Sequence, residues 1–126
     1  MEVNRPDVLA EVEAAFARYE AALINNDVAV LCELFHDDPN TIRYGIAENL
    51  YGYEEIKNFR TSRQMDKFSR TLSRTVITTY GDSFATAMTL FDRPPGGPGR
   101  QSQTWIKLHS GWRVVAAHVS RMQTPH

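Results

Sequence analysis

The chain has 126 residues and a mass of 14.3 kDa, enough for a single domain over residues 1–126 and too few for two cores. Its 42% hydrophobic and 23% charged residues exclude disordered, collagen-like and coiled-coil classes, and no apolar run approaches the roughly 18 residues of a membrane span. The net charge of −1 argues against a nucleic-acid-binding protein, which is usually basic overall. A single cysteine, Cys32, and a polar N-terminus predict a cytoplasmic location.

Helical periodicity dominates residues 4–35. Apolar residues recur there at three- and four-residue steps, and they predict a long helix that ends near residue 25. The members of this stripe are Val8, Val12, Ala15, Phe16, Tyr19, Ala22 and Leu23. A short second helix is expected after Asp27, and a third over residues 53–65.

Strand patterns take over in the rest of the chain. Residues 41–46 alternate as a short strand, residues 48–52 are expected to turn, and the Pro/Gly run 94–99 is expected to be a loop. Four further strands are predicted at 74–80, 84–91, 101–108 and 112–121. Short connections make consecutive strands antiparallel. The predicted fold class is therefore α+β, with a curved, mainly antiparallel sheet around the first helix and a pocket between them.

This order of elements resembles the NTF2-like superfamily, a cone-shaped fold, and the last predicted strand resembles its SnoaL-like members. Several segments are similar to the AtzH-like branch of that superfamily. They are residues 16–23, 41–45, 48–52 and 99–105. The resemblance implies a cofactor-free hydrolase, because the namesake of this branch converts 1,3-dicarboxyurea to allophanate in cyanuric acid catabolism. Fold alone does not fix function, so a non-catalytic binding module and a ketosteroid isomerase-like enzyme remain alternatives.

Two catalytic residues, Tyr19 and Arg43, are implied by the resemblance. Tyr19 lies on the apolar stripe of the first helix, so it is either a core tyrosine or a proton donor that points into the pocket. Arg43 would hold a substrate carboxylate in a bidentate manner. Strand alternation, however, puts Arg43 opposite Ile42 and Tyr44, which conflicts with a pocket role if those two residues face the core.

Gln103 and His118 are candidate substrate-binding residues. Gln103 shares its strand face with Gln101, and such polar residues need water, a ligand or a solvated outer face. His118 is expected on one face with Val114 and Ala116, either as a core residue or as a donor to a substrate oxygen. No histidine spacing is typical of a metal site, and no cofactor is expected.

Charge is divided unevenly along the chain. Residues 1–55 carry 12 acidic and 3 basic side chains, whereas residues 56–126 carry 3 acidic and 11 basic ones. The split predicts either self-complementary packing or an anion site on the C-terminal half, with a small anionic substrate as partner. The basic series Lys57, Arg60, Arg63, Lys67, Arg70 and Arg74 is expected to be a solvated face.

A homodimer is also expected. Trp105 and Trp112 give the last two strands more apolar surface than one helix layer is expected to cover. Packing of two sheets around a two-fold axis would bury that surface.

Overall fold

The structure is a computed structural model that describes residues 1–63 and 68–123. Its elements follow one another as α1 (Pro6–Asn25), α2 (Val28–Leu34), β1 (Ile42–Tyr44), β2 (Asn49–Tyr51), α3 (Tyr53–Ser62), β3 (Thr71–Tyr80), β4 (Phe84–Arg93), β5 (Gly97–Leu108) and β6 (Gly111–Arg121). None of the described helices combines the length and apolarity needed to cross a membrane.

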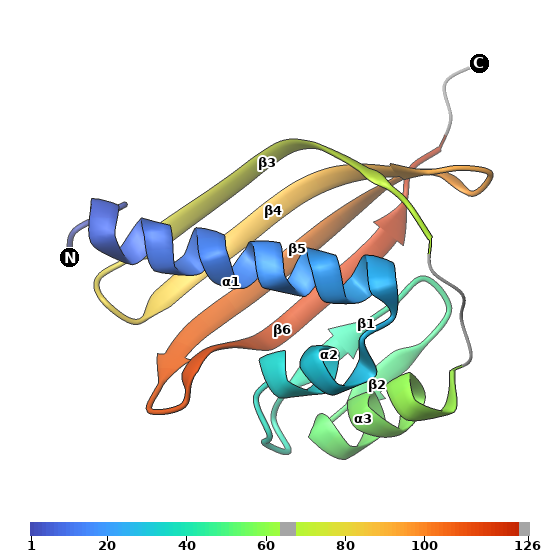
Figure 1. Cartoon of the computed structure of the whole chain (residues 1–126), viewed down its shortest axis with the longest axis horizontal. Helices are drawn as coiled ribbons and strands as arrows, with labels where there is room; N and C mark the ends of the chain where they lie inside the picture. The colour runs from blue at the N-terminus through green and yellow to red at the C-terminus, as the bar shows by residue number, and fades with distance from the viewer. Residues whose placement is uncertain (64–67, 124–126) are drawn as a thin grey trace.

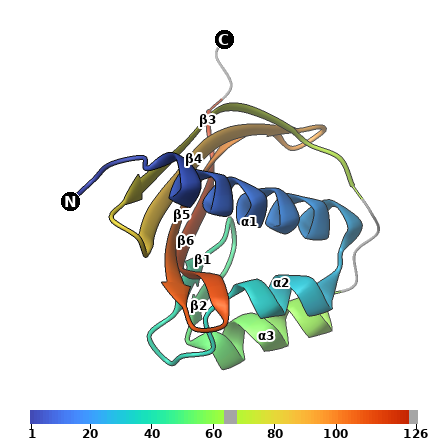
Figure 2. The ribbon, with the colours of Figure 1, turned by 60° about the vertical axis from the view of Figure 1, so that its left-hand side comes forward.

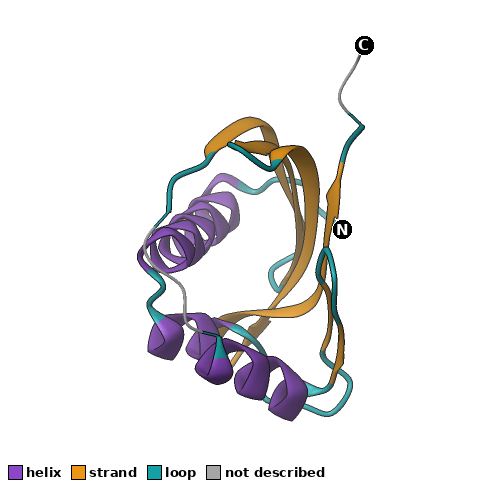
Figure 3. Ribbon diagram, turned by 90° about the vertical axis from the view of Figure 1, so that its right-hand side faces the viewer, coloured by secondary structure: helices purple, strands orange, loops and turns teal. Residues whose placement is uncertain are grey.

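The six strands form one sheet in the order β2-β1-β6-β5-β4-β3. All neighbours pair antiparallel except β1 and β6, which run parallel. The sheet curves around α1, and α2 and α3 lie beside each other near β1 and β2 (Figures 1 and 2). Seen along the sheet, all three helices lie on its concave side and leave the convex face bare (Figure 3). This arrangement confirms the predicted α+β class.

The core lies between α1 and the concave face of the sheet. Five members of the predicted stripe of α1 are buried, among them Tyr19 with 2% exposure. Trp105 and Trp112 are also buried, with 0% and 6% exposure. One helix layer therefore does cover both tryptophans, and the reason given above for a homodimer is wrong.

Three local predictions differ from the structure. Residues 48–52 are not only a turn, because β2 forms an antiparallel hairpin with β1 and buries Leu50. A three-residue strand is too short to show alternation in the sequence. The loop predicted at 94–99 is also shorter, since β5 begins at Gly97 and pairs with Arg93. The predicted third helix ends at Ser62, and residues 64–65 lie outside the described residues.

A β-bulge at Val115 sets the phase of β6. Trp105 pairs with Val114 and Thr104 with Ala116, so Val115 is the extra residue. Because of it, Val114 and Ala117 are both buried on the concave side, although they are three residues apart. His118 is displaced to the exposed, convex side, where its ring meets that of Tyr44 at 5.8 Å between centroids. The expectation that His118 shares a face with Val114 is therefore wrong.

Candidate functional site

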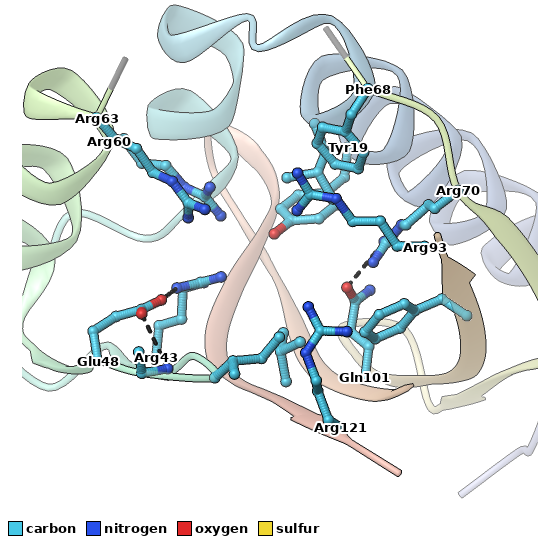
Figure 4. Close-up of a pocket in the computed structure, with 15 residues that line it drawn as sticks. Tyr19, Arg43, Glu48, Arg60, Arg63, Phe68, Arg70, Arg93, Gln101 and Arg121 are labelled. Atoms are coloured by element: carbon cyan, nitrogen blue, oxygen red, sulfur yellow. Dashed lines mark hydrogen bonds and ion pairs between the residues drawn. The ribbon is translucent and has the colours of Figure 1, made fainter. Parts of the chain in front are cut away.

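A cavity of about 260 Å³ opens beside the C-terminal half of α1, between the sheet, α3 and the β1–β2 turn (Figure 4). Six of the described arginines line it: Arg43, Arg60, Arg63, Arg70, Arg93 and Arg121. They come from β1, α3 and the residue after it, β4, β6 and the segment before β3. Among the described lining residues, Glu48 alone carries a carboxylate. The cavity is therefore strongly positive.

Tyr19 lies in the wall of this cavity and presents its hydroxyl to the centre (Figure 4). Its ring is fixed by edge contacts with Phe35 and Trp105, at centroid distances of 6.1 and 6.4 Å. The residue is thus a core tyrosine along its ring and a pocket residue at its hydroxyl. Such a rigid phenol is suited to donating a proton to a bound ligand.

Arg43 also lines the cavity, on the concave face of β1. Alternation does put it opposite Ile42 and Tyr44, but those two residues lie on the convex side, so the conflict with a pocket role disappears. Its Nη1 donates a 2.7 Å hydrogen bond to Glu48 Oε1. The buried Nε of Arg43 has no hydrogen-bond partner among the described residues.

Arg70 is held by two oxygen-bearing side chains. Its Nε and Nη2 donate to the two carboxylate oxygens of Glu20 at 2.8 and 2.6 Å, and Nη2 also donates to Gln101 Oε1 at 3.0 Å. This bidentate pair neutralises Arg70 and turns the Gln101 amide group into the pocket. Gln101 Nε2 is left buried and without a partner in the described part of the chain.

Arg60 is the most unusual residue of the site, since its side chain is buried and only 4% exposed. Nε and Nη2 of its guanidinium lack a hydrogen-bond partner within residues 1–63 and 68–123. Burial, and after it the repulsion from Arg43 and Arg63, lowers the pKa of Arg60. Phe59 compensates in part, because its ring centre is 5.9 Å from the Arg60 guanidinium.

Arg93 and Arg121 lie on the opposite side of the Tyr19 hydroxyl from Arg60 (Figure 4). Burial lowers the pKa of Arg93, and the positive charges of Arg63, Arg121 and Arg70 add to this effect. The Arg93 guanidinium stacks 3.8 Å from the Phe68 ring centre. Arg121 donates to the carbonyl of Gly96, and within the described residues no carboxylate pairs with either arginine.

Of the four residues predicted from the sequence, the cavity brings together Tyr19 and Arg43. Gln103 is buried beneath α1, but it does not line the cavity, and its Oε1 accepts a 3.0 Å hydrogen bond from Trp105 Nε1. His118 lies on the convex face of the sheet, outside the site. The neighbour of Gln103 on the same strand face, Gln101, occupies the place that was predicted for Gln103.

The sequence analysis missed five arginines of this site. Three of them, Arg60, Arg63 and Arg70, belong to the basic series expected to be a solvated face. That expectation is wrong for Arg60 and Arg70, whose side chains are buried, whereas Lys57, Arg63 and Arg74 are exposed. Lys67 lies outside the described residues. Helical spacing could not reveal this, because α3 ends at Ser62, before Arg63 and Arg70. The excess of basic residues in the C-terminal half was the available signal. The cavity collects six arginines, five of them from that half.

The described residues hold no group of three histidine, cysteine, aspartate or glutamate side chains placed to bind a metal ion. The cavity instead offers the N–H donors of its arginines around the phenol group of Tyr19. Such a set of groups can bind an oxyanion and supply a proton to it.

Comparison with known proteins places the chain by its fold and then by its family. The fold is that of the NTF2-like superfamily. A superfamily protein from Salmonella enterica serovar Typhimurium is 28% identical, with a TM-score of 0.71 and 94% of each chain covered. The AtzH-like family matches residues 1–125, and the chain belongs to that family.

Two similar solved structures have higher identity. A protein of unknown function of the DUF3225 family from Pectobacterium atrosepticum is 58% identical, with a TM-score of 0.92 over 96% of this chain and 95% of that one. A cystatin-like fold protein from Burkholderia xenovorans is 48% identical, with a TM-score of 0.94 and 99% of each chain covered. A search of the curated proteins found no match.

Proposed function

We propose that the arginine-lined cavity is the active site of a hydrolase that removes an N-carboxyl group from a small carboxylated urea. The substrate of this proposal is 1,3-dicarboxyurea, which carries two negative charges, and the products are allophanate and bicarbonate. The observation that carries it is the charge of the cavity, where six described arginines face only two carboxylates, that of Glu48 in the lining and that of Glu20 bonded to Arg70. A small dianion is the ligand class that such a charge favours.

In the proposed reaction, the bond between the carboxyl carbon and the urea nitrogen breaks. Water supplies a hydroxyl group to that carbon, which leaves as bicarbonate. The proton reaches the nitrogen from the Tyr19 hydroxyl, and the remaining proton of the water restores the phenol. Tyr19 is suited to this role because its hydroxyl lies between the arginines of α3 and those of β4 and β6 (Figure 4). Arg43, which the family resemblance implies as a site residue, would hold a substrate carboxylate.

The alternatives predict different cavities. A ketosteroid isomerase-like enzyme needs a carboxylate base and a second acidic donor in an apolar site. Among the described lining residues only Glu48 has a carboxylate, and that group is paired with Arg43. A non-catalytic module that binds a small acid fits the cavity as well, and it differs from the hydrolase in having no turnover.

The test is an assay with 1,3-dicarboxyurea, generated in situ because it is labile, and detection of allophanate. The wild-type protein should release allophanate faster than buffer does, and Tyr19→Phe should lose most of this activity. Tyr80→Phe serves as the control, since Tyr80 lies outside the cavity at the far end of β3. Binding without any rate above buffer would contradict the hydrolase and favour the binding module. The homodimer and the cytoplasmic location stay predictions beside this proposal.

A further inference from the structure

The buried polar atoms of the cavity lack acceptors. Within the described chain, four buried nitrogen atoms of lining residues have no partner: Arg43 Nε, Arg60 Nε, Arg60 Nη2 and Gln101 Nε2. All four are hydrogen-bond donors, and buried donors are normally satisfied. The missing partner is therefore a hydrogen-bond acceptor, and the positive charge of the lining arginines favours a carboxylate or another oxyanion.

Arg60 gives this inference its strongest support. A buried guanidinium with two unpartnered nitrogens is costly, and Glu48, whose charge acts on Arg60, is already bonded to Arg43. Two further arginines, Arg43 and Arg63, repel its charge. Phe59 offers only the face of a ring, which compensates a cation less than an anion does. A bound anion would remove this cost.

A second positive centre faces the first. Arg93 and Arg121 lie across the cavity, beyond the Tyr19 hydroxyl (Figure 4). Arg70 stands beside them but is neutralised by Glu20, so Arg93 and Arg121 carry the excess charge of that side. One oxyanion at Arg60 would leave this excess unpaired. A ligand with an acidic group at each end would pair with both positive centres.

The size of the cavity limits the ligand. Its volume of about 260 Å³ is below the roughly 300–1,000 Å³ of sites for drug-sized molecules. The ligand is therefore a short, unbranched molecule whose two acidic groups are separated by a few atoms.

We propose that the cavity binds short dianions end to end, with Arg60 as the main partner of one acidic group and Arg93 with Arg121 as partners of the other. The inference rests on the proposed function for its choice of cavity, and it adds the residues and the ligand class. It makes Arg60 a binding residue, alongside Arg43. It requires binding only, and holds whether or not the bound molecule is hydrolysed.

The experiment measures binding of stable probes by calorimetry at fixed ionic strength, together with the melting temperature. The probes are malonate, succinate and glutarate, the monoanions acetate and butyrate, and inorganic phosphate. At least one dicarboxylate should bind about 10-fold or more tightly than the monoanions and raise the melting temperature. Equal binding of phosphate and the dicarboxylates would overturn the two-ended site, as would no binding of any dicarboxylate.

Substitutions test which arginines bind each acidic group of the dicarboxylate. Arg60→Met and Arg93→Met should each weaken the best dicarboxylate about 10- to 100-fold, because each removes a charge-assisted partner. Arg100→Met is the matched control, since Arg100 is exposed on the same sheet but outside the cavity, and its affinity should equal the wild type. Unchanged affinity in Arg60→Met overturns the role of Arg60, and if that variant does not fold, Arg60→Gln replaces it. Dicarboxylate binding without dicarboxyurea turnover refutes the hydrolase and leaves this inference standing.

Discussion

Arg43 and Glu48 form a 2.7 Å ion pair inside the cavity, so that one of its cations is supplied with its own counterion from the neighbouring turn. The pair keeps one guanidinium oriented in an otherwise repulsive cluster. It leaves the buried Arg43 Nε without a partner among the described residues. The remaining positive charge of the cavity therefore comes from arginines that lack such a partner in the described chain.

We predict that Tyr19→Phe keeps the fold and loses most of the hydrolase activity. Only the hydroxyl is removed, and the ring contacts with Phe35 and Trp105 remain. Melting temperature and allophanate release are measured on the same preparation. If the hydroxyl is only structural, activity persists and stability falls by about 0.5–1.5 kcal/mol, the cost of one lost hydrogen bond.

Arg43→Lys should lower kcat/KM by roughly 30- to 1000-fold, because lysine keeps the charge but loses the planar, bidentate group. Stability should change little, since a lysine ammonium can still pair with Glu48. Normal turnover of the carboxylated urea in this variant would remove Arg43 from the mechanism. Glu48→Gln is the companion variant. It frees the Arg43 guanidinium and should tighten the binding of a dicarboxylate.

Arg60→Met should make the empty protein more stable. Replacing buried charge with an apolar side chain of similar size can stabilise a protein by about 1–4 kcal/mol when the charge is poorly paired. A urea titration of the ligand-free variant measures the change in the free energy of unfolding. A large loss of stability instead would mean that Arg60 has a structural partner.

Gly45→Ala should destabilise the β1–β2 hairpin. A methyl group at residue 45 would overlap the Glu48 carboxylate and approach Arg43 Nη1 to 2.9 Å. Displacing Glu48 leaves the buried Arg43 unpaired, at an expected cost of about 1–3 kcal/mol. The same substitution in a Glu48→Ala background should cost much less. An equal cost in both backgrounds would show that Gly45 matters for another reason.

The homodimer prediction now depends on the convex face of the sheet. Tyr51, Val76 and Met88 are about half exposed there, whereas both tryptophans are buried. Sedimentation should give a particle of twice the 14.3 kDa chain mass, and Met88→Arg should shift it toward the monomer. A monomer of the wild-type protein at micromolar concentration would contradict the prediction.

Much of the fold was predictable from the sequence, because its signals are periodic. The stripe of α1 includes Val12 and Tyr19 at helical spacing, and the long strands follow one another with short connections. Strand β2 was not predictable, since three residues show no period and their pairing depends on β1.

The site was predictable only in part. Tyr19 and Arg43 followed from the family resemblance, whereas Arg60 was hidden, because its burial depends on how α3 packs against the sheet. Gln103 and Gln101 have the same strand face, and only the end of α1 decides which one reaches the cavity. His118 was misplaced because a bulge leaves no clear mark in the continuous apolar run of residues 114–117.

The Val115 bulge decides which side chains of β6 reach the site. Before it, Trp112 and Val114 face the core, and after it, Val119 and Arg121 face the cavity. If Val115 joined the regular alternation and the bulge were lost, the first half of the strand would keep its facing and the second half would be inverted. Arg121 would then move to the convex face, and His118 would turn inward. The bulge therefore decides that a guanidinium and not an imidazole ring lines this part of the cavity, which makes residue 115 a point for redesigning the ligand preference of the fold.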